Sequence, residues 1–82
     1  MTAELTPTPT RLALLADVAA GNVVGSLYGH IINTAYGLRR TVTLRIWDMH
    51  RAGWVRSNAD DIWHLTDVGR TILDQHGWEA SR

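Results

Sequence analysis

Apolar residues recur at helical spacing in the first quarter of the chain. They fall on one side of a helix: Leu12, Leu14, Leu15, Val18 and Ala19. Thr8 and Pro9 form a typical helix start, because threonine caps free backbone N–H groups and proline has none to lose at the first helical position. We therefore expect a helix over residues 9–20, and Gly21 is expected to end it.

The pattern over residues 22–37 is ambiguous. Val23 and Val24, like Ile31 and Ile32, favour strands, with a turn at 27–30 between them. A short helix over residues 26–35 is the alternative, and it would be the second helix of a helix-turn-helix. We favour the hairpin, and the pattern leaves both structures open.

A second apolar stripe predicts a helix over residues 39–52. Its members are spaced by three or four residues: Leu38, Val42, Ile46, Met49 and Ala52. Gly53 supplies the left-handed residue that commonly ends a helix. With this stripe facing inward, we expect Arg40, Leu44, Trp47 and Arg51 to form the outward side of the helix.

A hairpin and a last helix are expected to complete the fold. Residues 54–56 and 62–65 have the pattern of short strands, and the polar cluster at 57–61 forms the turn between them. Thr66 is a suitable cap for a helix that ends at Gly77, and Asp67 in its first turn favours the helix dipole. The order predicts one α+β domain over residues 8–77, with a flexible arm at 1–7 and a tail at 78–82.

Charge is distributed unevenly along a chain whose net charge is zero. Residues 36–56 contain five arginines and one acid, Asp48, which gives this segment +4 and leaves −4 on the remainder. Such an asymmetry indicates an anionic partner for the basic segment. The alternative is a mixture of charges on a solvated helix.

Several classes of function are disfavoured by composition. The chain has no cysteine, which excludes disulfides, thiolate metal sites and cysteine nucleophiles. Its four histidines have no metal-ligand spacing, and no cofactor motif occurs, so we expect neither a metal, nor a cofactor, nor enzymatic activity. No apolar run reaches the roughly 20 residues of a membrane span, and no signal peptide is apparent, so we expect a cytoplasmic protein without a membrane partner.

The second half of the chain resembles a known family. Its Ala52-Gly53-Trp54-Val55 run and its Leu65-Thr66-Asp67-Val68-Gly69 run are similar to those of winged-helix DNA-binding proteins of the multiple-antibiotic-resistance and phenolic-acid-repressor types. The resemblance covers residues 38–73 and is nearest to short winged-helix proteins of actinobacteria and their phages. It implies three helices, with a recognition helix at 42–52 and a wing at 54–65. The hairpin favoured over residues 22–37 would stand in place of the usual second helix, whereas the alternative short helix would be that second helix.

The resemblance also implies a transcriptional regulator that binds double-stranded DNA sequence-specifically. The residues expected to contact DNA are Arg39, Arg40, Thr43, Arg45, Arg51 and Arg56. Arginine suits this role because its planar fork can engage guanine or phosphate with two hydrogen bonds. Because a domain of this size has a small stability margin, we also expect a homodimer.

A protein-interaction module is the alternative, for example a phage protein that inhibits a host protein. Its contact would be formed by Leu44, Trp47 and Arg51, since large apolar groups are unusual on a surface that contacts DNA. Asp60 and Asp61 in the predicted wing favour it too, because they would repel phosphate.

Overall fold

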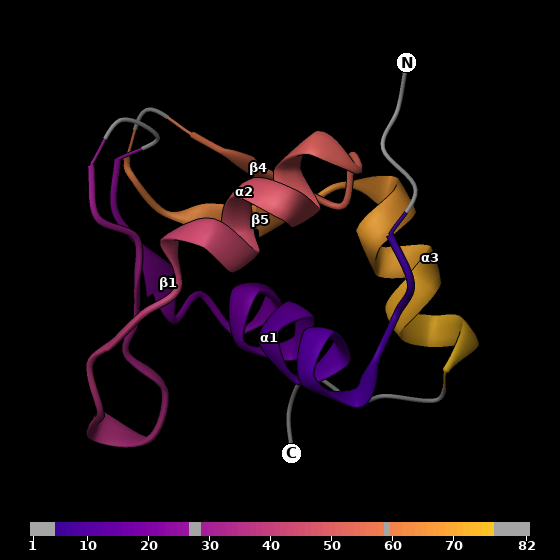
Figure 1. Ribbon diagram of the computed structural model, residues 1–82, viewed down its shortest axis with the longest axis horizontal. Coiled ribbons are helices and arrows are strands. Elements are labelled where there is room, and N and C mark those ends of the chain that lie inside the picture. The colour runs from indigo at the N-terminus through magenta and orange to yellow at the C-terminus, as the bar shows by residue number, and fades with distance from the viewer. Residues whose placement is uncertain (1–4, 27–28, 59, 77–82) are drawn as a thin grey trace.

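The computed structural model describes residues 5–26, 29–58 and 60–76. Within these ranges the chain forms an α+β fold of three helices and two antiparallel sheets (Figure 1). Residues 1–4 of the arm predicted at 1–7, the predicted helix end at Gly77 and the predicted tail at 78–82 lie outside the described residues. Leu5, at the start of the described chain, packs half-buried against the core.

The first helix, α1 (Pro9–Ala19), is confirmed together with its cap. The Thr8 hydroxyl accepts a hydrogen bond from the Arg11 backbone N–H at 3.3 Å, and Pro9 occupies the first helical position. Gly21 follows with a φ of +80°, which reverses the chain. The helix buries one side against the core, although Ala19, predicted on that side, is exposed.

Strands, and not a helix, occupy the ambiguous segment. β1 (Val23–Val24) pairs antiparallel with β2 (Ile32–Asn33), so the strand pairing of the predicted hairpin is confirmed. Residues 27–28 of its predicted turn lie outside the described residues. A third strand, β3 (Arg40–Thr41), pairs with the other edge of β2. A short 3₁₀ turn, η1 (Ala35–Gly37), joins β2 to β3, and this connection extends away from the body on the side opposite the third helix (Figure 1).

The central helix, α2 (Thr43–Arg51), is shorter than predicted. Arg39 and Arg40 precede it in extended backbone, so the helical start expected at residue 39 is wrong. The physical reason is pairing with β2, in which the Val42 N–H donates to the Ile31 carbonyl at 2.8 Å. The inward stripe is confirmed from Val42 through Ile46 to Met49, all buried, and Gly53 ends the helix with a φ of +82°.

The predicted hairpin and last helix are also present. β4 (Val55–Ser57) pairs with β5 (Trp63–Leu65), and a single bridge between Val24 and Ile62 links this hairpin to β1. The last helix, α3 (Asp67–Gln75), is capped by Thr66, whose hydroxyl accepts from the Gly69 N–H at 3.1 Å.

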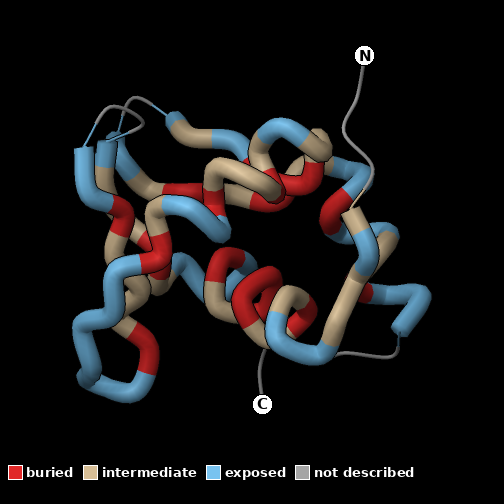
Figure 2. The backbone as a smooth tube through the Cα atoms, viewed as in Figure 1, coloured by how far each residue is buried: buried red, intermediate tan, exposed pale blue. Residues whose placement is uncertain are grey.

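The core lies where α1, α3 and the β4–β5 hairpin meet beneath α2 (Figure 2). Trp63 is fully buried, and its indole N–H donates to the Gly25 carbonyl at 3.1 Å, which ties the hairpin to the turn after β1. Trp54 and its neighbour Val55 are buried as well, at 4% and 1% exposure. No helix among the described residues is long and apolar enough to cross a membrane.

Candidate nucleic-acid interface

The five arginines of residues 36–56 are supplied by three elements. Arg40 comes from β3 and Arg39 directly precedes it, Arg45 and Arg51 come from opposite ends of α2, and Arg56 comes from β4. All five are exposed to solvent. The fold therefore presents the basic segment on the surface, where guanidinium groups can meet an anion.

The five differ in how far their charge is already compensated. Arg51 forms a 2.7 Å ion pair with Asp48, and Arg56 donates to the neutral side chain of Asn58 at 3.2 Å. Within the described part of the chain, the side chains of Arg39, Arg40 and Arg45 form neither an ion pair nor a hydrogen bond. These three, which we call the open arginines, hold five donors each that only solvent or a ligand can use.

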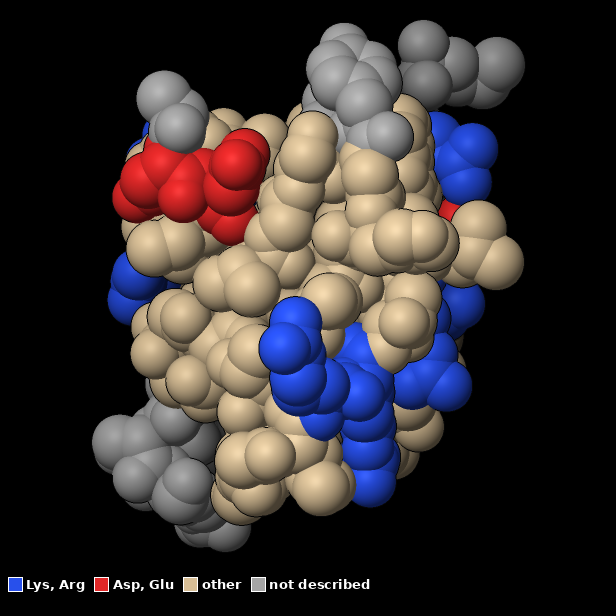
Figure 3. Space-filling view, turned by 90° about the vertical axis from the view of Figure 1, so that its left-hand side faces the viewer, with Lys and Arg blue, Asp and Glu red and all other residues tan. Residues whose placement is uncertain are grey.

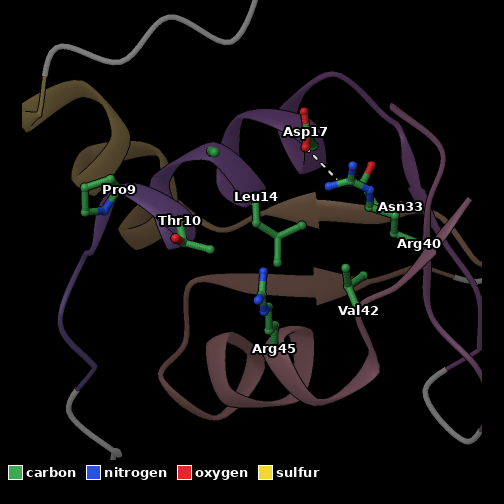
Figure 4. A pocket seen from close by; sticks show the side chains of 9 residues that line it. Pro9, Thr10, Leu14, Asp17, Asn33, Arg40, Val42 and Arg45 are labelled. Atoms are coloured by element: carbon green, nitrogen blue, oxygen red, sulfur yellow. Dashed lines mark hydrogen bonds between the residues drawn. The ribbon is translucent and has the colours of Figure 1, made fainter. Parts of the chain in front are cut away.

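A groove brings two of the open arginines together (Figure 4). It has a volume of about 420 Å³ and lies between α1 and the β3–α2 junction, with Arg40 and Arg45 in its lining. Leu14 and Val42 supply apolar surface within it, and Arg45 points from α2 toward Leu14. A neighbouring hollow extends the groove past Arg45 to Arg11. Basic side chains from α1, β3 and α2 thus line two neighbouring hollows that share Thr10 and Arg45.

Two acidic side chains border this basic area, Asp17 in the groove and Asp48 in the neighbouring hollow. On the face shown in Figure 3, the largest arginine surface lies at the lower centre and right, with smaller areas at the left edge and upper right, and acidic surface forms a large area at the upper left and a small one at the right. At the wing position, Asp60 accepts from the Ile62 N–H at 3.1 Å and lies 4.0 Å from His64. Asp17, in the groove, accepts from the Asn33 side-chain amide at 2.8 Å. Asp17, Asp48 and Asp60 therefore already have partners within the fold.

Thr43 has a structural contact. Its half-buried hydroxyl accepts the Ile31 N–H at 3.0 Å, which fixes the start of α2 to β2. Of the residues expected to bind DNA, Thr43 is the one whose polar group is engaged in holding the sheet.

The stripe proposed for a protein interface is divided by the fold. Leu44 is 81% exposed, whereas Trp47 packs half-buried against the core and meets the His50 ring edge-on at 6.2 Å. Arg51 is paired with Asp48. Leu44 is therefore the one apolar side chain of the three that projects freely.

Two exposed residues near the open arginines were missed by the sequence analysis. Tyr36 is 87% exposed and Leu38 is 48% exposed, both at the connection from β2 to β3. Leu38 was expected on the inward stripe, and that expectation is wrong because the helix begins four residues later than predicted. The signal for an exposed turn was the Tyr36-Gly37 pair, since glycine favours a tight turn.

Among the described residues, no group of three or more histidine or acidic side chains could hold a metal ion. Comparison with known proteins found no matching family model, no matching curated protein and no matching solved structure.

Proposed function

We propose that this chain is a small winged-helix regulator that binds double-stranded DNA sequence-specifically, probing the duplex with α2 and using the β4–β5 hairpin as its wing. The observation that carries the proposal is the set of open arginines, two of which line one groove between α1 and α2. Exposed guanidinium groups without an internal partner gain most from a polyanion, since each can replace condensed counterions on a phosphate.

The roles of the individual residues follow from their positions. Arg45, on the first turn of α2, is placed to contact a base edge or phosphate if this helix end enters the major groove. Arg39 and Arg40 reach the flanking phosphates, and Arg56 reaches the backbone from the wing. Thr43 and Arg51 act indirectly: Thr43 positions α2 against β2, and Arg51 balances Asp48 on the same helix.

Fluorescence anisotropy with a labelled random-sequence duplex of about 30 base pairs tests this proposal. The wild-type chain should bind at low salt and weaken steeply toward physiological salt. The double variant Arg40→Gln/Arg45→Gln should lower the affinity and reduce the salt slope by about 2, close to one for each lost phosphate contact. Unchanged affinity of this variant at low salt would show that the site assignment is wrong.

Arg70→Gln is the matched control. Arg70 is exposed on α3, away from the groove, so its loss changes the net charge with no loss of a proposed contact. Its affinity should remain close to that of the wild type.

One observation favours a second candidate function, docking of a protein partner on α2. Leu44 is 81% exposed on a helix whose other large apolar residues face inward or pack against the core. A chain that binds no duplex at low salt, but holds a protein partner that the Leu44→Gln variant loses, would support this function over DNA binding.

The proposed regulator is expected to act as a homodimer, because winged-helix regulators commonly read two half-sites related by the symmetry of a dimer. We also expect it to act in the cytoplasm. Sedimentation equilibrium at micromolar protein tests the dimer. A monomer at every concentration would contradict it.

A further inference from the structure

The connection between β2 and β3 is an exposed arm whose tip side chains bury little. We define this connection, residues 33–41, as the arm; it is distinct from the N-terminal arm predicted at residues 1–7. Tyr36 and Leu38 are among the few large apolar side chains that the described part of the chain exposes, at 87% and 48%. The arm extends away from the helices (Figure 1). Exposed aromatic and aliphatic groups gathered at one tip indicate contact with something outside the fold.

The base of the arm is held firmly by side chains. Asn33 donates from its amide to the Asp17 carboxylate at 2.8 Å and accepts from the Ala35 N–H at 3.0 Å. Thr34 donates to the Asn22 carbonyl through its N–H and through its hydroxyl, each at 2.8 Å. These bonds connect the arm to α1 and to the residue before β1, so the tip is presented in one orientation.

Tyr36 holds an unusual backbone conformation at this tip. Its φ is +61° and its ψ is +25°, and Gly37 follows with a φ of +72°. Bulky side chains rarely occupy the left-handed region, which asparagine and glycine enter more easily. Strained residues of this kind occur preferentially at functional sites. At 87% exposure, Tyr36 gains little internal packing to offset the strain.

Charge indicates what the tip would meet. Residues 18–47 contain no aspartate or glutamate, and Arg39 and Arg40 directly follow the exposed pair. A small hollow at the base of the arm is lined by Tyr36, Leu38 and Arg40 and by one acid, Asp17, whose carboxylate accepts a hydrogen bond from Asn33. Arg40 also lines the groove with Arg45. The tip is therefore continuous with the basic surface, and an anionic partner that covers the groove also reaches the arm.

We infer that the arm is a second DNA-binding element, which places Tyr36 as an apolar wedge in the minor groove of the duplex that α2 holds. This inference rests on the proposed function. Proteins that bind the minor groove combine arginines with apolar side chains that enter a base step and kink the duplex by roughly 20–90°. Arg39 and Arg40 supply the cations here, and Tyr36, supported by Leu38, supplies the wedge.

The test compares wild type with Tyr36→Asn on a duplex of about 30 base pairs that carries a donor and an acceptor dye at its ends. Energy transfer reports bending, and anisotropy reports affinity in the same samples. Asparagine tolerates the left-handed conformation, so the variant should melt at the wild-type temperature or above it. Val68→Asn removes another exposed apolar side chain, 52% exposed on α3 and outside the proposed contact, and is the control.

The wild type and Val68→Asn should raise energy transfer equally, whereas Tyr36→Asn should lose the bend and bind about 5- to 100-fold more weakly, as for the loss of one base–aromatic stack. Equal bending and equal, salt-dependent affinity for Tyr36→Asn would overturn the wedge and leave the proposed function intact. If the wild type fails to bind duplex at low salt, both proposals fall.

Discussion

The Cα of Gly69, in the first turn of α3, lies directly against the backbone carbonyl of Trp54. A Cβ added to Gly69 would lie 2.1 Å from that carbonyl oxygen, far inside any real contact distance. The same oxygen accepts the Thr66 N–H at 3.0 Å. The start of α3 is thus packed on the backbone that leads into the β4–β5 hairpin, with no space for a side chain.

We therefore predict that Gly69→Ala destabilises the fold. Backbone on both sides must move, so the cost should reach at least the roughly 1–3 kcal/mol of an overpacked core. Urea unfolding followed by tryptophan fluorescence measures it. The control is Gly29→Ala, where the nearest atom to the added Cβ is the Ser26 Cβ at an ordinary 3.6 Å. Equal midpoints for the two variants would contradict the close approach.

Thr66 joins the same two elements through its hydroxyl. This hydroxyl donates to the Gly53 carbonyl and accepts from the Gly69 N–H. Thr66→Ala should therefore lower the free energy of unfolding by about 1–2 kcal/mol, in the range of a lost N-cap. Thr66→Ser keeps both bonds and should retain most of the stability. A serine variant as unstable as the alanine variant would show that the methyl group, and not the hydroxyl, matters.

The arm depends on Asn33, which bridges Asp17 and the Ala35 N–H. Asn33→Asp replaces the donor to Asp17 with a second negative charge, so it should loosen the arm by about 1–3 kcal/mol at neutral pH. Hydrogen exchange of the Leu38 N–H, bonded to the Ala35 carbonyl, should accelerate. Asn33→Ser is the uncharged comparison, with a smaller effect. Slow exchange in both variants would mean that the arm is held by its backbone pairing alone.

Leu44 and Trp47 should contribute differently to the free energy of unfolding. Leu44→Gln should change the free energy of unfolding by less than about 0.5 kcal/mol, because the side chain is exposed. Trp47→Ala should cost about 2 kcal/mol, less than the loss of a fully buried tryptophan, because its ring packs half-buried against the core. Thermal melts of both variants measure the difference. If Trp47→Ala leaves the melting temperature unchanged, Trp47 belongs to the outward surface of α2 and not to the core.

The parts of the fold that follow from local chemistry could be predicted from the sequence. Thr8 and Thr66 cap their helices, and Gly53 reverses the chain, because each signal depends on a few neighbouring residues. The β4–β5 hairpin is equally local, with a polar turn between two short strands that bury alternate side chains.

The β3 strand could not be predicted, because it depends on pairing with β2 about eight residues away. Leu38 continues the helical spacing of Val42 and Ile46, so periodicity alone favours a longer helix. Two hydrogen bonds favour a strand instead: the Ile31 carbonyl accepts from the Val42 N–H, and the Ile31 N–H donates to the Thr43 hydroxyl. The arginines of the candidate site were therefore identified by charge, but two of them were placed on the wrong element.

The central claim, that the basic surface binds duplex DNA, is tested most directly by the salt dependence of binding. If Arg39, Arg40, Arg45 and Arg56 each neutralise one phosphate, log K should fall with log salt with a slope of about −3.6. Arg45→Gln should reduce the slope by about 0.9, and Arg70→Gln should leave it unchanged. No binding at low salt, or equal slopes for Arg45→Gln and the wild type, would contradict the account.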